Sequence, residues 1–345
     1  MNRAIQFGVL LLLAFVQVSE AEEAPLKLLK QLSLSPKEIS RMLRGEIVAK
    51  KLETSDKRDI AVLGVMALNV PAIATVEAAR DIKTFKEGKE ILGLGKFVSF
   101  DPDELKALTL EDEEATELGN CRIHDCDSKL PGAWIEKLRN EKDKKKRIQL
   151  FRVLLADYAK DYSLRGNKAV LNYEGTKHPV PAQKEFESIL EHSSYLKRLA
   201  PDFYQYLKEY PDKQPADTEN FIYWSREKFG FKPVTNLTHV SIFKWTNSDL
   251  SGYMIASRQV FADHYSDASL GLTILIDRPP LDGKSPGSYL IYINRSRIDM
   301  LGGFLSSFRR ALTLPRIRSG LQLHMKTMRT RVEDKARKQS SSVSQ

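Results

Sequence analysis

DIAVLGVMALNVPAIATVEAARDI, residues 59–82, passes from a β-prone apolar run to a helical pattern at a single proline. Residues 59–70 favour a strand, and Pro71 both ends that strand and suits the first turn of a helix. Beyond the proline, apolar residues recur every three or four positions, at Ile73, Val76, Ala79, Ile82 and Phe85. That spacing is typical of one helix face. The stretch therefore predicts a strand followed directly by a helix.

The segments around this stretch predict further short elements. The segment SPKEISRML predicts a helix with Ser35 or Ser40 as its cap, and GEIVAKKLE predicts a strand that a TSDK turn connects to residue 59. On the other side, KFVSF (96–100) predicts a strand. GLGK (93–96) lacks the glycine spacing and the Ser or Thr of a phosphate-binding loop, so it is interpreted as a turn.

The second half of the chain changes its hydrophobic period. Residues 131–230 place apolar residues at helical spacing with a charged opposite face, and we expect a helical block that includes TENFIYWSREKF. From residue 238 the period is two, and THVSIFKW, GYMIASRQVFADHY, SLGLTILID and SYLIYINRSR predict four strands. A C-terminal helix follows, which we expect to kink or break near Pro315 or Gly320.

The order of these elements resembles the START-like, helix-grip superfamily. Residues 59–82 resemble its opening strand and proline-led helix, and the run from His239 to Arg331 resembles its last hairpins and closing helix. The resemblance implies an α+β fold, in which a curved antiparallel sheet surrounds a long C-terminal helix and encloses an apolar tunnel. The helical block would be a large insertion, and Pro315 departs from the unbroken closing helix of the family.

These patterns also predict the boundaries of the parts. We expect a signal peptide, two parts of one START-like domain, an insertion and a disordered tail. They cover residues 1–21 (signal peptide), 22–130 (N-terminal part), 131–234 (helical insertion), 235–338 (C-terminal part) and 339–345 (tail).

The first residues have the features of a secretory signal. Arg3 precedes an apolar run, and Ser19 and Ala21 provide the small residues at −3 and −1 that a signal peptidase requires. The apolar run is shorter than the roughly 20 residues that a bilayer-spanning helix needs. The sequence therefore predicts an exported protein, periplasmic or extracellular, with its signal peptide cleaved after Ala21.

The chain has two cysteines, Cys121 and Cys126, in the segment GNCRIHDCDSKLP. A close pair in an exported chain predicts a disulfide. A metal site would recruit His124 with Asp125 or Asp127, but so short a segment cannot easily place four ligands around one ion. Haem attachment would need a histidine directly after Cys126.

The positive charge is concentrated at the C-terminus. The net charge of the chain is +9, and residues 300–345 contain ten Lys or Arg against Glu333 and Asp334, a net of +8. This excess favours an anionic membrane surface as a partner, and we expect no nucleic-acid partner.

The polar knot Asp263, His264, Tyr265 and Asp267 is the strongest candidate for catalytic chemistry. Adjacent strand residues point to opposite faces, so Asp263 and His264 cannot form a simple dyad. We interpret the knot as a bend between two strands, and His239 as an exposed residue at a strand start. The sequence predicts no catalytic residues, no metal ligands and no cofactor.

The resemblance to a ligand-holding fold suggests where a ligand would lie. Alternation groups Phe261 with Ile255, Ser257 and Gln259 on one strand face, while Arg258 lies on the other. A guanidinium group suits an acidic head group. The residues that we expect at the ligand are Arg258, Phe261, Tyr289, Arg295, Arg297 and, on the closing helix, Phe304 and Phe308.

The function that the sequence favours is that of an exported binding protein. Its ligand would be a hydrophobic or amphiphilic molecule, with a lipid as the expected case, held between sheet and helix. Two alternatives remain open at this point: a secreted enzyme of cyclase or hydrolase type that uses the same cavity, and an envelope protein-interaction module whose helical block is the working surface.

Overall fold

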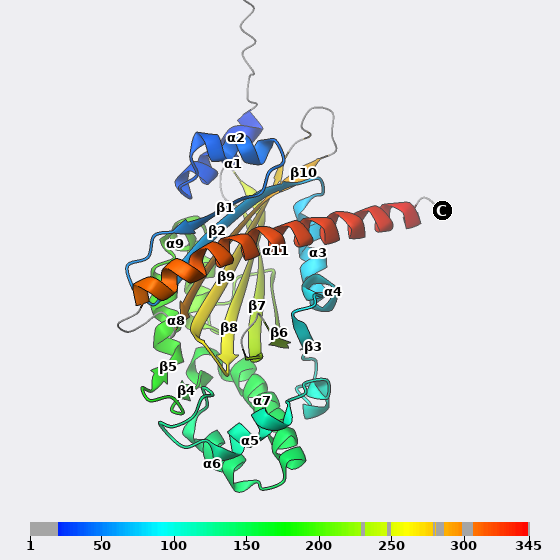
Figure 1. Ribbon diagram of the computed structural model, residues 1–345. Helices are drawn as coiled ribbons and strands as arrows, with labels where there is room; N and C mark the ends of the chain where they lie inside the picture. The colour runs from blue at the N-terminus through cyan, green and yellow to red at the C-terminus, as the bar shows by residue number, and fades with distance from the viewer. Residues whose placement is uncertain are drawn as a thin grey trace, which may run out of the picture.

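The computed structural model describes residues 20–228, 232–246, 250–278, 280, 286–298 and 306–343. Its centre is an eight-stranded sheet with the strand order β1-β2-β10-β9-β8-β7-β6-β3 (Figure 1). Every neighbouring pair in this sheet is antiparallel. The strands are β1 (Val48–Leu52), β2 (Asp59–Leu68), β3 (Ile91–Lys96), β6 (Thr218–Glu227), β7 (Val234–Thr246), β8 (Ser251–Ala262), β9 (Ser266–Arg278) and β10 (Gly287–Ile298). The α+β class with a large antiparallel sheet is confirmed.

Helices cover both faces of the sheet (Figure 1). One face, here called the helical face, packs against a core to which most of the helices contribute. These are α1 (Glu20–Gln31), α2 (Pro36–Leu43), α5 (Asp112–Asn120), α6 (Gly132–Asn140), α7 (Lys144–Arg165), α8 (Ala182–Glu191), α9 (Ser194–Leu199) and α10 (Pro201–Glu209). The other face, here called the cavity face, packs against α3 (Ala72–Arg80), α4 (Ile82–Lys86) and α11 (Ser306–Val343). A separate two-stranded ribbon pairs β4 (Asn172–Tyr173) with β5 (Val180–Pro181).

Strand β2 is buried on both sides, which its unbroken apolar sequence predicts. Leu63 and Val65 belong to the core on the helical face, whereas Val62 and Met66 belong to the core on the cavity face. A Cβ atom on Gly64 would collide with Sδ of Met325 on α11. The missing side chain therefore lets the helix approach the strand closely.

The transition at Pro71 is as expected. Pro71 is the N-cap of α3, and its extended backbone (φ −64°, ψ 158°) leads from β2 into the helix. The backbone N–H of Ala72 donates to Asp277 Oδ1 at 2.7 Å, which satisfies one of the unpaired donors of the first turn. The expected cap of α2 is also confirmed, because Ser35 and Glu38 form a capping box.

Three local predictions of strands, helices and turns before β7 were wrong. KFVSF does not form a strand, because β3 ends at its first residue, Lys96. TENFIYWSREKF is not helical: most of it forms β6, which pairs with β3 and β7. Its aromatic and branched residues alternate between the two faces, which suits a strand buried on both sides. The helical insertion therefore ends before Thr218, well short of the expected residue 234.

GLGK is part of strand β3 and not a turn. The glycines are needed because the indole of Trp224 on β6 lies over them: a Cβ on Gly95 would be 2.5 Å from Trp224 Nε1. Trp224 Nε1 donates to the carbonyl of Glu104 at 3.0 Å, which fixes the ring in this position. Here close packing, and not turn geometry, explains the glycines.

Helix α11 lies across the cavity face, and its C-terminal end extends beyond α3 (Figure 1). Its buried stripe, Leu321, Met325, Met328 and Val332, has helical spacing and packs on β1, β2 and α3. The helix runs unbroken through Pro315 and Gly320, so the expected break was wrong, and the expected tail from residue 339 is helical as far as Val343.

The disulfide between Cys121 and Cys126 is present, with an S–S distance of 2.02 Å. Cys121 directly follows α5, and an isolated bridge joins Arg122 to Asp125 inside the loop that the bond closes. Among the described helices, none has the length and the apolar character to cross a bilayer. The expected signal peptide lies outside the described residues except for its last two positions.

Candidate functional site

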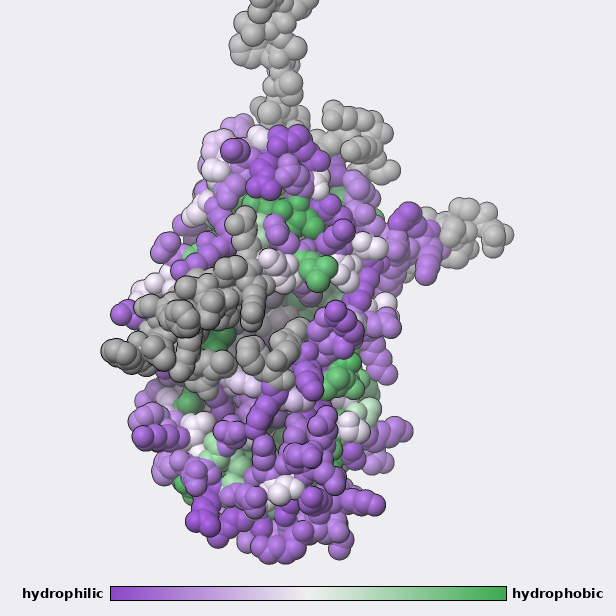
Figure 2. Space-filling model, in the orientation of Figure 1, coloured by the Kyte–Doolittle hydropathy of each residue, from purple (hydrophilic) through white to green (hydrophobic). Residues whose placement is uncertain are grey.

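Two adjoining pockets open on the cavity face. The first, here called the floor pocket, has a volume of about 470 Å³ and lies on the strands β7 to β10. The second, here called the helix pocket, has a volume of about 640 Å³ and lies between β2, β3, β6, β10, the end of α4 and α11. Lys86, Glu227, Tyr292 and Asn294 line both. Figure 2 shows that this side of the molecule is mainly hydrophilic, with small hydrophobic patches.

The floor pocket is polar because strand alternation places hydroxyl and amide side chains on this face. Asn236 and Thr238 come from β7, Ser257 and Gln259 from β8, and the register sets Thr238 opposite Gln259. Leu237 and Val260, which directly follow Asn236 and Gln259, belong to the helical-face core. On the cavity face, the end of the sheet away from α11 therefore presents polar side chains, whereas the other end of the sheet presents apolar side chains.

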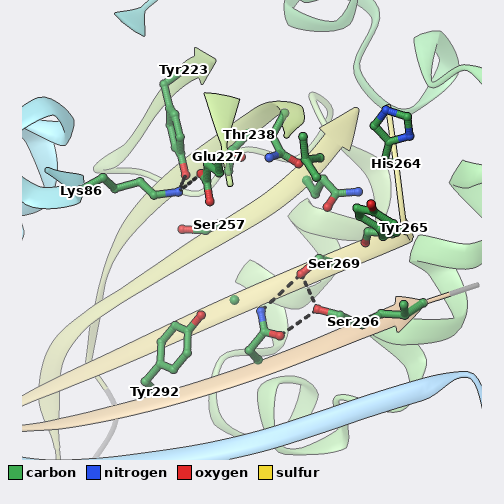
Figure 3. A pocket seen from close by; sticks show the side chains of 17 residues that line it. Lys86, Tyr223, Glu227, Thr238, Ser257, His264, Tyr265, Ser269, Tyr292 and Ser296 are labelled. Atoms are coloured by element: carbon green, nitrogen blue, oxygen red, sulfur yellow. Dashed lines mark hydrogen bonds and ion pairs between the residues drawn. The ribbon is translucent and has the colours of Figure 1, made fainter. Parts of the chain in front are cut away.

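Three further polar residues form a hydrogen-bonded group on β9 and β10 (Figure 3). Asn294 Nδ2 donates to Ser269 Oγ at 3.3 Å, Ser296 Oγ donates to Asn294 Oδ1 at 2.8 Å, and the two serine oxygens are 2.8 Å apart. Gly271 lies beside them and also lines the pocket. A Cβ on Gly271 would be 3.4 Å from Tyr292 Oη, an ordinary contact, so the side chains of Tyr292 and Asn294 border this position.

An ion pair lies where the two pockets meet (Figure 3). Lys86 Nζ is 2.6 Å from Glu227 Oε1 and donates to Tyr223 Oη at 3.3 Å. Burial alone lowers the pKa of Lys86, but its interactions with Tyr223 and Glu227 outweigh burial and raise that pKa. Burial raises the pKa of Glu227, but Lys86 and Ser225 outweigh it and lower that pKa. Both groups are therefore charged at neutral pH and neutralise each other.

The helix pocket is more apolar. Val62 on β2, Phe85 on α4, Ile91 on β3 and Leu321 on α11 line its walls. Leu323 is 64% exposed and also lines this pocket. An apolar space of this kind, next to a polar floor, is suited to a molecule with one apolar and one polar part.

The arginines expected at the ligand lie on the helical face, away from both pockets. Arg258 is buried, its guanidinium is 3.6 Å from the centroid of the Phe186 ring, and its Nη2 donates to Gln183 Oε1 at 2.7 Å. Arg297 forms ion pairs with Asp59 at 2.7 Å and Glu185 at 2.5 Å.

Arg295, which is partly buried, interacts with Tyr195 of α9. Thus Arg258, Arg295 and Arg297 connect the sheet to the helical insertion and do not border the pockets. An acidic head group on the cavity face would not reach any of the three.

The expected aromatic lining also lies on the helical face. Phe261 is fully buried among Trp134, Tyr158 and Tyr173, and Tyr289 is in the same core. A β-bulge explains why Phe261 lies on the helical face. Leu237 pairs with Phe261 but Thr238 pairs with Gln259, so Val260 is an extra residue that reverses the alternation. Phe304 and the side chain of Phe308 lie outside the part of the chain that the structure describes.

The polar knot is a bend between β8 and β9, which confirms the expectation. Tyr265 has a left-handed backbone (φ 62°), and Asp263 Oδ1 accepts from the backbone N–H of Thr235 at 2.8 Å. Asp263 is buried in this turn, whereas His264 lines the floor pocket.

His239 is buried in the helical face, and the expectation that it is exposed was wrong. Its Nε2 is 2.9 Å from Asn220 Oδ1, which can only accept, so Nε2 carries the hydrogen. Its Nδ1 then accepts from the Tyr162 hydroxyl at 3.0 Å. Burial, with a smaller contribution from Arg258, lowers the pKa of His239 to about 3.

Ser257 and Gln259 share one face in the strand pattern but are not among the predicted ligand residues, and Thr238, Lys86 and Glu227 are not predicted at all. The mixed polarity of the β8 pattern was a usable signal for the first two. No local signal marks Lys86, because its partner Glu227 is 141 positions away in the chain.

Several basic residues of α11 have structural partners. Arg329 donates to the carbonyl of Gly45 at 2.9 Å, Arg331 donates to that of Phe85 at 2.9 Å, and Lys335 lies 3.8 Å from Asp81. These contacts hold the helix against the body. Binding of this helix to an anionic membrane stays a prediction of the sequence.

Within the ranges that the structure describes, no group of three or more His, Cys, Asp or Glu side chains is arranged to hold a metal ion. A comparison of the sequence with models of known protein families found no match, and a comparison with curated protein sequences found none either.

Proposed function

We propose that the protein binds an amphiphilic small molecule in the floor and helix pockets together. The apolar part of the ligand lies in the helix pocket, against α11, and the polar part lies on the floor pocket. The observation that carries this proposal is that the two pockets, one apolar and one polar, share lining residues at Lys86, Glu227, Tyr292 and Asn294. Each volume is in the range of ordinary small-molecule sites.

We further propose that the fold is a START-like helix grip. The support is the element order: β2, Pro71, α3 and α4, then β3 and the strands β6 to β10, and finally α11 across the sheet. The helical insertion lies between β3 and β6 and packs on the helical face. In this proposal the insertion seals the far side of the sheet, and the cavity face holds the ligand.

We also propose that the protein acts outside the cytoplasm. The predicted signal sequence motivates this proposal, and the bond between Cys121 and Cys126 is compatible with it.

Displacement of the neutral fluorophore N-phenyl-1-naphthylamine by hexanol, octanol and decanol tests the binding proposal. Each buried methylene contributes about 0.8 kcal/mol, so affinity should rise up to about fourfold per CH₂ until the helix pocket is full. Gly320→Leu should weaken decanol binding at least tenfold, because Gly320 lines the helix pocket and has open space at its Cβ position. This variant should also gain helix stability, so lost binding would not reflect unfolding.

Leu164→Ala is the matched control, because Leu164 is an exposed apolar residue on α7, away from both pockets. It should leave all three affinities unchanged. Affinity independent of chain length, or equal affinity in wild type and Gly320→Leu, would exclude the helix pocket as the apolar site.

A further inference from the structure

We infer that the polar part of the ligand is an uncharged, hydroxyl-rich group such as a sugar ring. This inference rests on the proposed function, since it concerns the polar end of the same molecule. It follows from the charge balance of the two pockets, from the hydrogen-bonding groups that the floor presents, and from the position of the arginines.

Among the side chains that the structure describes, the charges around the pockets cancel. Among the described residues of the floor pocket, the charged groups are Lys86 and Glu227, which pair with each other at 2.6 Å. In the helix pocket Lys86, Lys89 and Arg331 are matched by Glu87, Glu90 and Glu227. Arg331 is moreover engaged, because it donates to the carbonyls of Phe85 and Glu87. On the floor pocket, a charged head group would therefore have to break the pair of Lys86 and Glu227 to find a counter-charge.

The floor instead offers unused neutral hydrogen-bonding groups. Asn236, Thr238, Ser257 and Gln259 are half-buried or buried, and their side chains have no hydrogen bond to the described part of the protein. They lie on the adjacent strands β7 and β8, with Thr238 opposite Gln259. Two amides and two hydroxyls supply donors and acceptors in the same small area, which is what a ring of hydroxyl groups requires.

The rest of the floor fits the same kind of group. Gly271 removes a side chain at the centre, and the hydrogen-bonded group of Ser269, Asn294 and Ser296 borders the space on its other side (Figure 3). Hydroxyl and amide groups that remain unpaired in such a site reject ligands that lack matching polar atoms.

The test compares four molecules with the same eight-carbon chain at pH 7.5: octyl β-glucoside, octanol, octanoate and octyltrimethylammonium, each below its micelle concentration. Binding to the full chain is measured by displacement of N-phenyl-1-naphthylamine. We expect octyl β-glucoside to bind at least tenfold more tightly than the other three. The double variant Thr238→Val/Ser257→Ala should reduce its advantage over octanol at least fivefold and leave octanol binding unchanged.

Ser163→Ala/Thr330→Val is the matched control, because it removes the same hydroxyl groups from positions on α7 and α11 that line neither pocket. This control should keep the full preference for the glucoside. Octanoate or octyltrimethylammonium binding as tightly as the glucoside would overturn the inference while the binding proposal stands. No binding of any of the four, octanol included, would overturn the proposed function itself.

Discussion

Acidification from pH 6.5 to pH 3 is expected to remove up to about 5 kcal/mol of the free energy of unfolding through His239 alone. The folded state holds the pKa of this imidazole at about 3, below the roughly 6.5 of an unfolded chain. The unfolded state therefore binds the proton more tightly. The stabilisation is fully present above pH 6.5 and is lost as the pH falls towards 3.

Urea unfolding followed between pH 4.5 and pH 7 measures this effect, before most carboxylates titrate. His239→Gln keeps hydrogen-bonding groups but cannot titrate. Its free energy of unfolding should therefore fall less steeply with acidification than that of the wild type, and the two slopes should differ by about 1.4 kcal/mol per pH unit. His178→Gln is the matched control, because His178 is exposed, and it should keep the wild-type slope. Parallel slopes for wild type and His239→Gln would show that His239 does not titrate as a buried neutral group.

Met325→Ala is expected to lower the free energy of unfolding by about 2–5 kcal/mol, because it leaves a cavity where α11 crosses β2. Met325 is fully buried, and its Sδ lies directly over Gly64. The measurement is urea unfolding at neutral pH. Leu323→Ala, on the same helix but 64% exposed, should change stability by less than about 0.5 kcal/mol. Equal effects of the two substitutions would mean that α11 does not pack on the sheet through this face.

Much of the sheet could be predicted from local pattern. The strand β2, the proline-led helix and the four strands from β7 to β10 each follow from a clear period over their own residues. β6 was missed because its aromatic residues and charges fit either period, and its pairing with β3 connects segments separated by the whole helical insertion. The strand at GLGK was missed because its glycines are needed for packing against Trp224, a residue far away in the sequence.

The site was harder to predict than the fold, because it depends on which face of each strand is covered. The pattern of β8 shows two mixed faces and does not say which face the insertion covers. The extra residue Val260 then moves Phe261 from the cavity face to the helical face. The carbonyl of Val260 accepts from the Tyr158 hydroxyl at 2.8 Å, a contact from α7 that the local sequence cannot reveal. The arginines were assigned to a ligand, but Arg258 and Arg297 pair with residues of the insertion.

We expect the apolar part of a ligand to lie between the sheet and α11. Photo-cross-linking of the intact chain with an alkanol that carries a diazirine at the end of its chain tests this position. The adducts, mapped by mass spectrometry of tryptic peptides, are expected on the peptide of residues 319–326, which contains Gly320, Leu321 and Leu323 of the helix pocket. An excess of unlabelled decanol should suppress them. Adducts that are suppressed by decanol but lie on α7 or α8, with none on residues 319–326, would contradict the account.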